Sequence, residues 1–118
     1  MNKIINEVYI NNTDDTDKKR FMATIFYFSN GKARYKTIKF GQKGAFTYLD
    51  GAPEEKRKNY ILRHIVREDF NNPLTNGFWS RWFIWEERKK YLKLILRNIM
   101  RQSNIIIKDI YIDKNINI

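Results

Sequence analysis

The pattern of apolar and polar positions predicts strands in the first third of the chain. Residues 3–10 alternate on a two-residue period, which is typical of a half-buried strand. Residues 21–28 are rich in aromatic and branched side chains, and residues 32–40 alternate again. Asn30-Gly31 between these runs predicts a hairpin, because both central positions of a type I′ turn need positive φ.

These strands also predict which residues share a face. The first strand places on one side Ile4, Asn6, Val8 and Ile10. The hairpin pairs Phe28 with Ala33, Phe26 with Tyr35 and Thr24 with Thr37 on one side, and Tyr27 with Arg34, Ile25 with Lys36, Ala23 with Ile38 and Phe21 with Phe40 on the other. The side with Arg34 and Lys36 mixes rings and cations, as nucleic-acid-binding surfaces do. We favour the simpler interpretation, an outward face with ordinary cross-strand pairs.

Helical periodicity follows in the middle of the chain. Residues 53–68 predict a helix that starts with a proline and two acids. Its expected apolar face consists of Ile61, Leu62, Ile65 and Val66. Residues 78–85 predict a second helix capped by Thr75, and residues 86–101 predict a third with the clearest amphipathic pattern.

Strand character returns at residues 104–112, where Ile106, Ile110 and Ile112 fall on one side. This strand would be an exposed edge unless it joins the hairpin sheet or another subunit. The expected fold class is α+β: a small antiparallel sheet of the N-terminal strand and the Asn30-Gly31 hairpin, open to the C-terminal strand, packed on two or three helices. A length of 118 residues favours one domain, with residues 1–41 mainly β, 42–102 mainly α and 103–118 a strand and tail.

Large rings are concentrated between residues 78 and 85, which include Trp79, Trp82 and Trp85. Three indoles on one short helix are more typical of a core than of a ligand site, because each buries on the order of 200 Å². We therefore expect the hydrophobic core here. Arg81 falls on the other side of this helix, where it would stack on a ring or reach a phosphate.

The charge balance suggests a polyanionic partner. Lys and Arg total 23 against 13 Asp and Glu, which leaves a net charge of +10. A basic surface that only maintains solubility is the alternative. The cations that we expect to contact phosphates are Arg57, Arg63, Arg67, Arg81, Lys89, Lys93, Arg97 and Arg101.

Catalytic and metal-binding signatures are missing from the sequence. The chain has no cysteine and one histidine, His64, which cannot form a zinc site or a triad with the residues around it. We expect His64 to pack or to form a hydrogen bond. The adjacent carboxylates of Glu68 and Asp69 would point in different directions on a helix. We predict no catalytic residue, no metal, no cofactor and no enzymatic activity. With no apolar run near 18 residues and no signal-like segment, we also expect a protein without a membrane span that is not secreted.

The central block of the sequence contains a set of motifs: Phe40-Gly41, Tyr60 with Arg63-His64, Glu68-Asp69-Phe70 and Thr75 with Gly77-Phe78-Trp79-Ser80-Arg81-Trp82. With these motifs the block resembles a functionally uncharacterised family of small basic proteins from large DNA viruses of protists. It covers residues 38–85. Two departures occur. The first lies before the arginine-rich helix, at residues 50–55, where the family usually has His-Lys-Asp-Pro-Glu-Arg. The second follows the last tryptophan, at residues 86–88, where the family usually has Asn-Lys-Pro. The resemblance implies a viral source and a place in the virion, the host cytoplasm or a viral factory.

Two functional hypotheses follow. The first is a non-catalytic protein that binds nucleic acid, with DNA as the first expectation, through phosphate contacts whose strength falls with salt. The second is a minor capsid or shell-cementing protein that contacts viral structural proteins, and that can form oligomers through its isoleucine-rich terminal strands. Charge leads us to favour the first.

Overall fold

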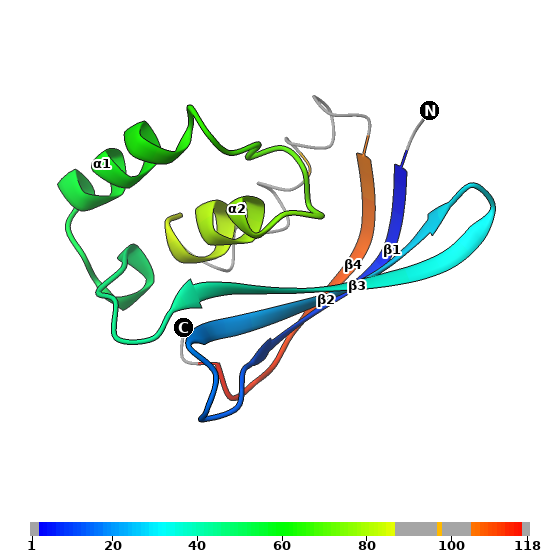
Figure 1. Ribbon diagram of the computed structural model, residues 1–118, viewed down its shortest axis with the longest axis horizontal. Helices are drawn as coiled ribbons and strands as arrows, with labels where there is room; N and C mark the ends of the chain where they lie inside the picture. Colours follow the sequence, from blue (N-terminus) through cyan, green and yellow to red (C-terminus); the bar gives the residue numbers. More distant parts are fainter. Residues whose placement is uncertain (1–2, 87–96, 98–104, 117–118) are drawn as a thin grey trace.

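The computed structural model describes residues 3–86, 97 and 105–116. Its elements are β1 (Lys3–Asn12), β2 (Lys19–Ser29), β3 (Lys32–Gln42), the 3-10 turn η1 (Tyr48–Asp50), α1 (Glu54–His64), α2 (Asn76–Trp79), the π-helical turn η2 (Ser80–Ile84) and β4 (Ile105–Ile112). The strands form one sheet in the order β3-β2-β1-β4 (Figure 1). The protein thus combines a four-stranded mixed sheet with two short helices.

The β2–β3 hairpin has the predicted turn and register. Asn30 and Gly31 have φ values of 52° and 76°, as a type I′ turn requires. Each of the seven predicted cross-strand pairs is present, from Phe28 with Ala33 to Phe21 with Phe40. The Asn-Gly pair therefore determines which residues of this hairpin face the core.

The prediction of a purely antiparallel sheet is wrong for its last strand. β4 joins the free edge of β1 in parallel orientation, so that Ile5 is opposite Ile107 and Ile10 is opposite Ile112. The alternation predicted for the first strand is also wrong. A bulge between Ile5 and Glu7 adds one residue to β1, which places Ile5 and Val8 on the same buried side.

The same irregularity separates the isoleucines of β4. Ile107, Ile110 and Ile112 pack against the core, whereas Ile106 is 43% exposed. The predicted apolar side of Ile106, Ile110 and Ile112 is therefore incorrect at its first member. A two-residue period holds only while a strand is regular, and the bulge in β1 interrupts it.

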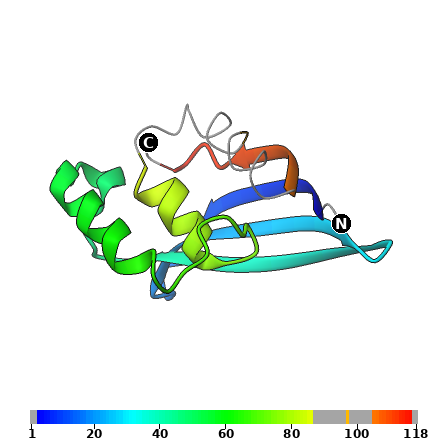
Figure 2. The same cartoon turned by 90° about the horizontal axis from the view of Figure 1, so that it is seen from above.

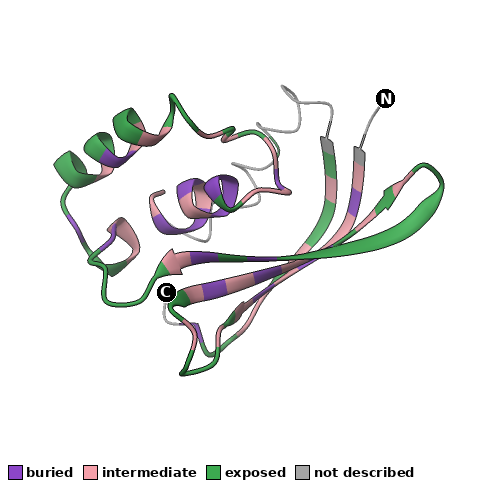
Figure 3. Ribbon diagram, in the orientation of Figure 1, coloured by how far each residue is buried: buried purple, intermediate pink, exposed green. Residues whose placement is uncertain are grey.

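The core lies between one face of the sheet and the α2–η2 segment (Figure 3). Phe83 contacts Phe21 and Phe40 with ring centroids 5.3 and 5.8 Å apart. Trp79 is fully buried, and its indole Nε1 donates to the Pro73 carbonyl oxygen at 2.8 Å. Burial of such a ring contributes about 2–3 kcal/mol. The predicted aromatic core is thus confirmed.

Local sequence explains where α2 begins. The Thr75 hydroxyl oxygen accepts a hydrogen bond from the Phe78 backbone N–H, which confirms the predicted cap. The spacing of the helical hydrogen bonds then widens from four residues to five, and the Trp85 N–H donates to the Ser80 carbonyl oxygen at 3.1 Å. This π-helical turn rotates the following side chains away from the positions that an α-helical period assigns to them.

Helix α1 ends at His64 rather than at residue 68, and three of the four residues of the predicted apolar face are exposed. Leu62, Ile65 and Val66 are 70%, 56% and 79% exposed. The helix packs instead through Tyr60, whose ring stacks on that of Trp85 at a centroid distance of 4.6 Å. Figure 2 shows α1 lying beyond α2 rather than on the sheet. Of the helix predicted at residues 86–101, the structure describes only Glu86 and Arg97, and Arg97 is helical and exposed.

An ion pair connects β2 to η1. The Arg20 guanidinium binds the Asp50 carboxylate through two contacts of 2.7 and 2.8 Å, and the Thr47 N–H and hydroxyl donate to the same group. The hydrogen bonds from Arg20, with those from Thr47, lower the pKa of Asp50 to about 2.

We predict that Asp50→Asn lowers the stability at neutral pH by about 1–2 kcal/mol. Because the folded-state pKa of Asp50 lies below the usual value of 3.8, its contribution is present above that value and disappears as the pH falls toward about 2. Urea unfolding between pH 7 and pH 2 should therefore show a shallower acid loss for the variant. Asp15→Asn, at an exposed loop position, is the control and should match the parent protein. Equal acid profiles for the parent protein and Asp50→Asn would contradict the prediction.

Candidate nucleic-acid interface

The eight cations predicted to contact phosphates fall into three groups. Arg57 and Arg81 are engaged in ion pairs inside the protein. Arg63, Arg67 and Arg97 are exposed. The remaining three lie outside the described residues: Lys89, Lys93 and Arg101.

Arg57 and Arg81 share one carboxylate, that of Glu86. The distance from Arg57 Nη2 to Glu86 Oε1 is 2.7 Å, and that from Arg81 Nη1 to Glu86 Oε2 is 3.1 Å. Both arginines also donate to the Trp85 carbonyl oxygen. Arg57 comes from α1 and Arg81 from η2, so this cluster fastens the helix to the core. Both guanidinium groups thus have partners inside the protein, and phosphate contact by them stays a prediction.

Arg81 is only 8% exposed, although the helical pattern placed it on the solvent side. The π-helical turn and the Glu86 carboxylate together account for its burial. Its guanidinium carbon lies 4.2 Å from the centroid of the Trp82 ring, which confirms the stacking that the sequence suggested. Burial lowers the pKa of the Arg81 guanidinium.

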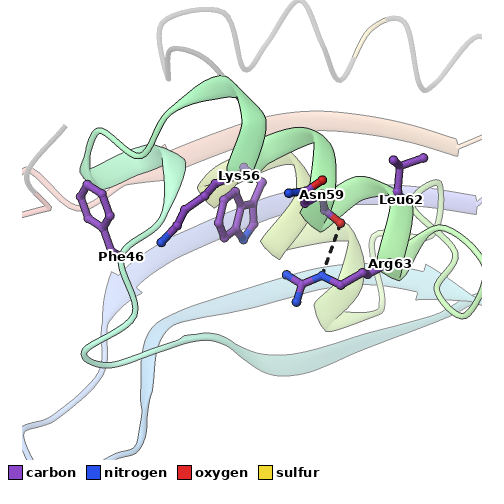
Figure 4. A pocket seen from close by; sticks show the side chains of 6 residues that line it. Phe46, Lys56, Asn59, Leu62 and Arg63 are labelled. Carbon is purple, nitrogen blue, oxygen red and sulfur yellow. Dashed lines mark hydrogen bonds between the residues drawn. The ribbon is translucent and has the colours of Figure 1, made fainter.

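A groove of about 700 Å³ lies between α1 and the loop before η1 (Figure 4). Its lining consists of Phe46, Lys56, Asn59, Leu62, Arg63 and Trp85. Lys56 Nζ is 5.4 Å from the centroid of the Phe46 ring, and Arg63 Nε donates to the Asn59 carbonyl oxygen at 3.4 Å. The two rings, Phe46 and Trp85, can stack on a planar base, while the two cations, Lys56 and Arg63, can contact its phosphate.

Among the predicted site residues that the structure describes, only Arg63 lines this groove. Sequence reasoning missed Phe46, because the loop that carries it has no periodic pattern. Lys56 was not among the cations expected to contact phosphates, although its spacing of seven residues from Arg63 places both on one side of the helix.

The β2–β3 hairpin forms a second basic surface. Residues 18–49 contain no Asp or Glu, and their cations are Lys18, Lys19, Arg20, Lys32, Arg34, Lys36, Lys39 and Lys43. Some of these are bound inside the protein: Lys39 pairs with Asp17, and Lys36 Nζ donates to the Leu74 carbonyl oxygen at 2.9 Å. Lys32 and Arg34 are exposed near the hairpin tip, and neither has a carboxylate partner among the described residues.

The hairpin tip extends beyond the part of the sheet that the helices cover (Figure 1). Every residue from 31 to 37 is exposed, so both faces of the tip are open to solvent. The sequence feature that indicates this surface is the absence of Asp and Glu from residues 18–49, rather than any motif. The predicted cation list omitted it because the basic-aromatic side was interpreted as an ordinary sheet face.

His64 has a structural role. Its Nδ1 lies 3.1 Å from Glu68 Oε1, and its ring stacks on that of Tyr60. Within the described ranges, no group of three or more His, Asp or Glu side chains could hold a metal ion. No described helix combines the length and the apolar character needed to cross a membrane.

Comparison with known proteins gives one similarity. Residues 13–64, which run from the loop before β2 to the end of α1, match a family of unknown function (DUF5754). The match includes the acid-free hairpin and all four groove residues that α1 supplies, which are Lys56, Asn59, Leu62 and Arg63. No curated protein and no solved structure matches the chain.

We predict that Glu86→Gln lowers the free energy of unfolding by about 2–3 kcal/mol, because it leaves two largely buried guanidinium groups without their carboxylate. Urea denaturation followed by tryptophan fluorescence measures this loss. Glu54→Gln is the matched control, since Glu54 pairs with Arg57 at an exposed position. That variant should lose no more than about 0.5 kcal/mol. Equal losses in the two variants would contradict the structural role of Glu86.

Proposed function

We propose that the protein binds nucleic acid through phosphate contacts and performs no catalysis. The observation that supports this most is the hairpin tip, where Lys32 and Arg34 are exposed and without acidic partners inside an acid-free segment. A two-stranded ribbon fits the major groove of B-form DNA, and cations along it neutralise backbone phosphates. The net charge of +10 extends the attraction over the whole molecule.

The proposed contact surface differs from the one expected from the sequence alone. It adds Lys32 and Arg34 on the hairpin and Lys56 beside Arg63 in the groove. It retains Arg67 and Arg97 as exposed cations and omits Arg57 and Arg81. The sequence resemblance to proteins of large DNA viruses favours DNA as the ligand and a virion or viral factory as the setting.

A minor structural role in a viral shell is the second proposal. The exposed aromatic side chains of the sheet favour it, because contiguous apolar surface of this kind is typical of protein interfaces. Self-association through the terminal strands is a narrower form of the same idea. β4 is the edge strand of the described sheet, so that association between sheet edges would involve the edge of β4 that faces away from β1.

We predict that labelled duplex DNA binds with an affinity that falls steeply as the NaCl concentration rises. Lys32→Gln/Arg34→Gln should reduce the slope of log K against log salt by about 1.8, since each lost phosphate contact contributes about 0.9. Fluorescence anisotropy measures both affinity and slope, with single-stranded DNA and RNA as parallel ligands.

Lys58→Gln/Lys114→Gln removes the same charge from exposed positions outside the hairpin and the groove, and should change the slope less. No binding of any nucleic acid at low salt would overturn the proposed function. An equal effect of the two double variants would remove the hairpin from the contact surface.

A further inference from the structure

The second face of the sheet carries a row of aromatic rings that crosses all four strands. Its members are Tyr111 of β4, Tyr9 of β1, Phe26 of β2 and Tyr35 of β3. Neighbouring ring centroids are 5.0 Å apart for Tyr9 and Tyr111, 5.9 Å for Tyr9 and Phe26, and 6.1 Å for Phe26 and Tyr35. The helices α1 and α2 lie on the opposite side of the sheet (Figures 1 and 2).

Three of these rings are open to solvent, and Tyr9 is half-buried. Phe26, Tyr35 and Tyr111 are 39%, 70% and 47% exposed. Soluble proteins rarely leave so many large side chains together on one face unless something binds there. The row therefore marks an interaction surface on the side of the sheet opposite the core.

A hollow of about 400 Å³ lies beside the centre of this row. Glu7, Tyr9, Asn11, Thr24 and Phe26 line it. The Tyr9 hydroxyl donates to the Glu7 carboxylate, which leaves the other carboxylate oxygen for a ligand. The hollow thus offers two rings, a carboxylate, an amide and a hydroxyl.

A second carboxylate stands next to Glu7. Asp109 of β4 is its register partner in the parallel pair with β1. The hydrogen bond to Glu7 raises the pKa of the Tyr9 phenol, and the charge of Asp109 adds to that effect. Among the described residues neither carboxylate forms an ion pair, and Lys108, although adjacent to Asp109, binds neither.

The charge of this surface identifies the kind of ligand. Two neighbouring unpaired carboxylates repel phosphate, so this face does not suit the polyanion that the hairpin would bind. A guanidinium group suits both the carboxylates and the aromatic rings of this face, because it binds a carboxylate through parallel hydrogen bonds and stacks on aromatic faces. An ammonium group makes the same contacts less specifically.

We infer that the hollow binds an arginine side chain of a partner protein, with Glu7 as the anionic contact, Tyr9 and Phe26 as the stacking walls, and the charge of the neighbouring Asp109 adding to the attraction. This interface goes beyond nucleic-acid binding and does not depend on it. It gives the protein two surfaces of opposite charge preference, one on the hairpin tip and one on the outer face of the sheet.

The test uses the full chain and a fluorescein-labelled peptide of alternating glycine and arginine. Because the protein carries a charge of +10, a cationic peptide without a specific site is repelled, and saturable binding is diagnostic. Glu7→Gln keeps the shape of the side chain and an acceptor for Tyr9, and should weaken binding about fivefold to tenfold. Asp109→Asn should weaken it less, and Phe26→Leu about threefold.

Glu55→Gln removes one exposed carboxylate from α1 and is the control, with no expected change in affinity. Thermal unfolding of each variant establishes that the fold is intact. The inference is overturned if the arginine peptide does not bind, or if Glu7→Gln and Glu55→Gln bind it equally. It is also overturned if single-stranded DNA binds this face and loses affinity in Phe26→Leu but not in Glu7→Gln.

A second copy of the chain could itself supply the arginine, since Arg34 is exposed at the hairpin tip. Sedimentation of the protein alone would then show association that both Glu7→Gln and Arg34→Gln abolish. That outcome supports the inferred site and identifies the partner. Loss of DNA binding in the hairpin variants with unchanged peptide binding would separate this interface from the proposed function.

Discussion

The packing of Phe83 against the sheet is the contact on which the rest of the structure depends. Its ring meets Phe21 and Phe40, and so joins the helical segment to the two strands of the hairpin. The chain comes so close here that a Cβ at Gly41 would lie 2.7 Å from Ile84 Cδ1, and the φ of +74° at that glycine suits no other residue well. One face of the sheet is thereby covered, and the other is left for binding.

The described cations lie in two kinds of environment, one inside the protein and one exposed to solvent. Arg57 and Arg81 converge on Glu86 and hold α1 to the core, where they are largely screened from any ligand. Lys32 and Arg34 project from the hairpin without acidic neighbours among the described residues. Net charge alone cannot distinguish the two kinds, because it counts a buried guanidinium and an exposed one equally.

Local signals in the sequence were reliable, and signals that depend on distant partners were not. The Asn30-Gly31 turn fixed the whole hairpin register, and Thr75 marked the start of α2. The bulge in β1 and the parallel pairing of β4 depend on contacts between segments far apart in the chain. The exposed face of α1 shows a further limit: an amphipathic pattern around Leu62 indicates that an apolar side exists, but not that another element covers it.

The position of β1 between β2 and β4 affects how the protein folds. One edge of β1 pairs early with β2, but its other edge pairs with β4, where Lys3 is opposite Ile105. Contacts between such distant residues form slowly, because a long loop must close first. Until then the nascent chain presents an unsatisfied row of backbone amides and carbonyls, a template for aggregation. The long sequence separation between β1 and β4 therefore makes the unpaired edge of the first strand a place where aggregation can begin during folding.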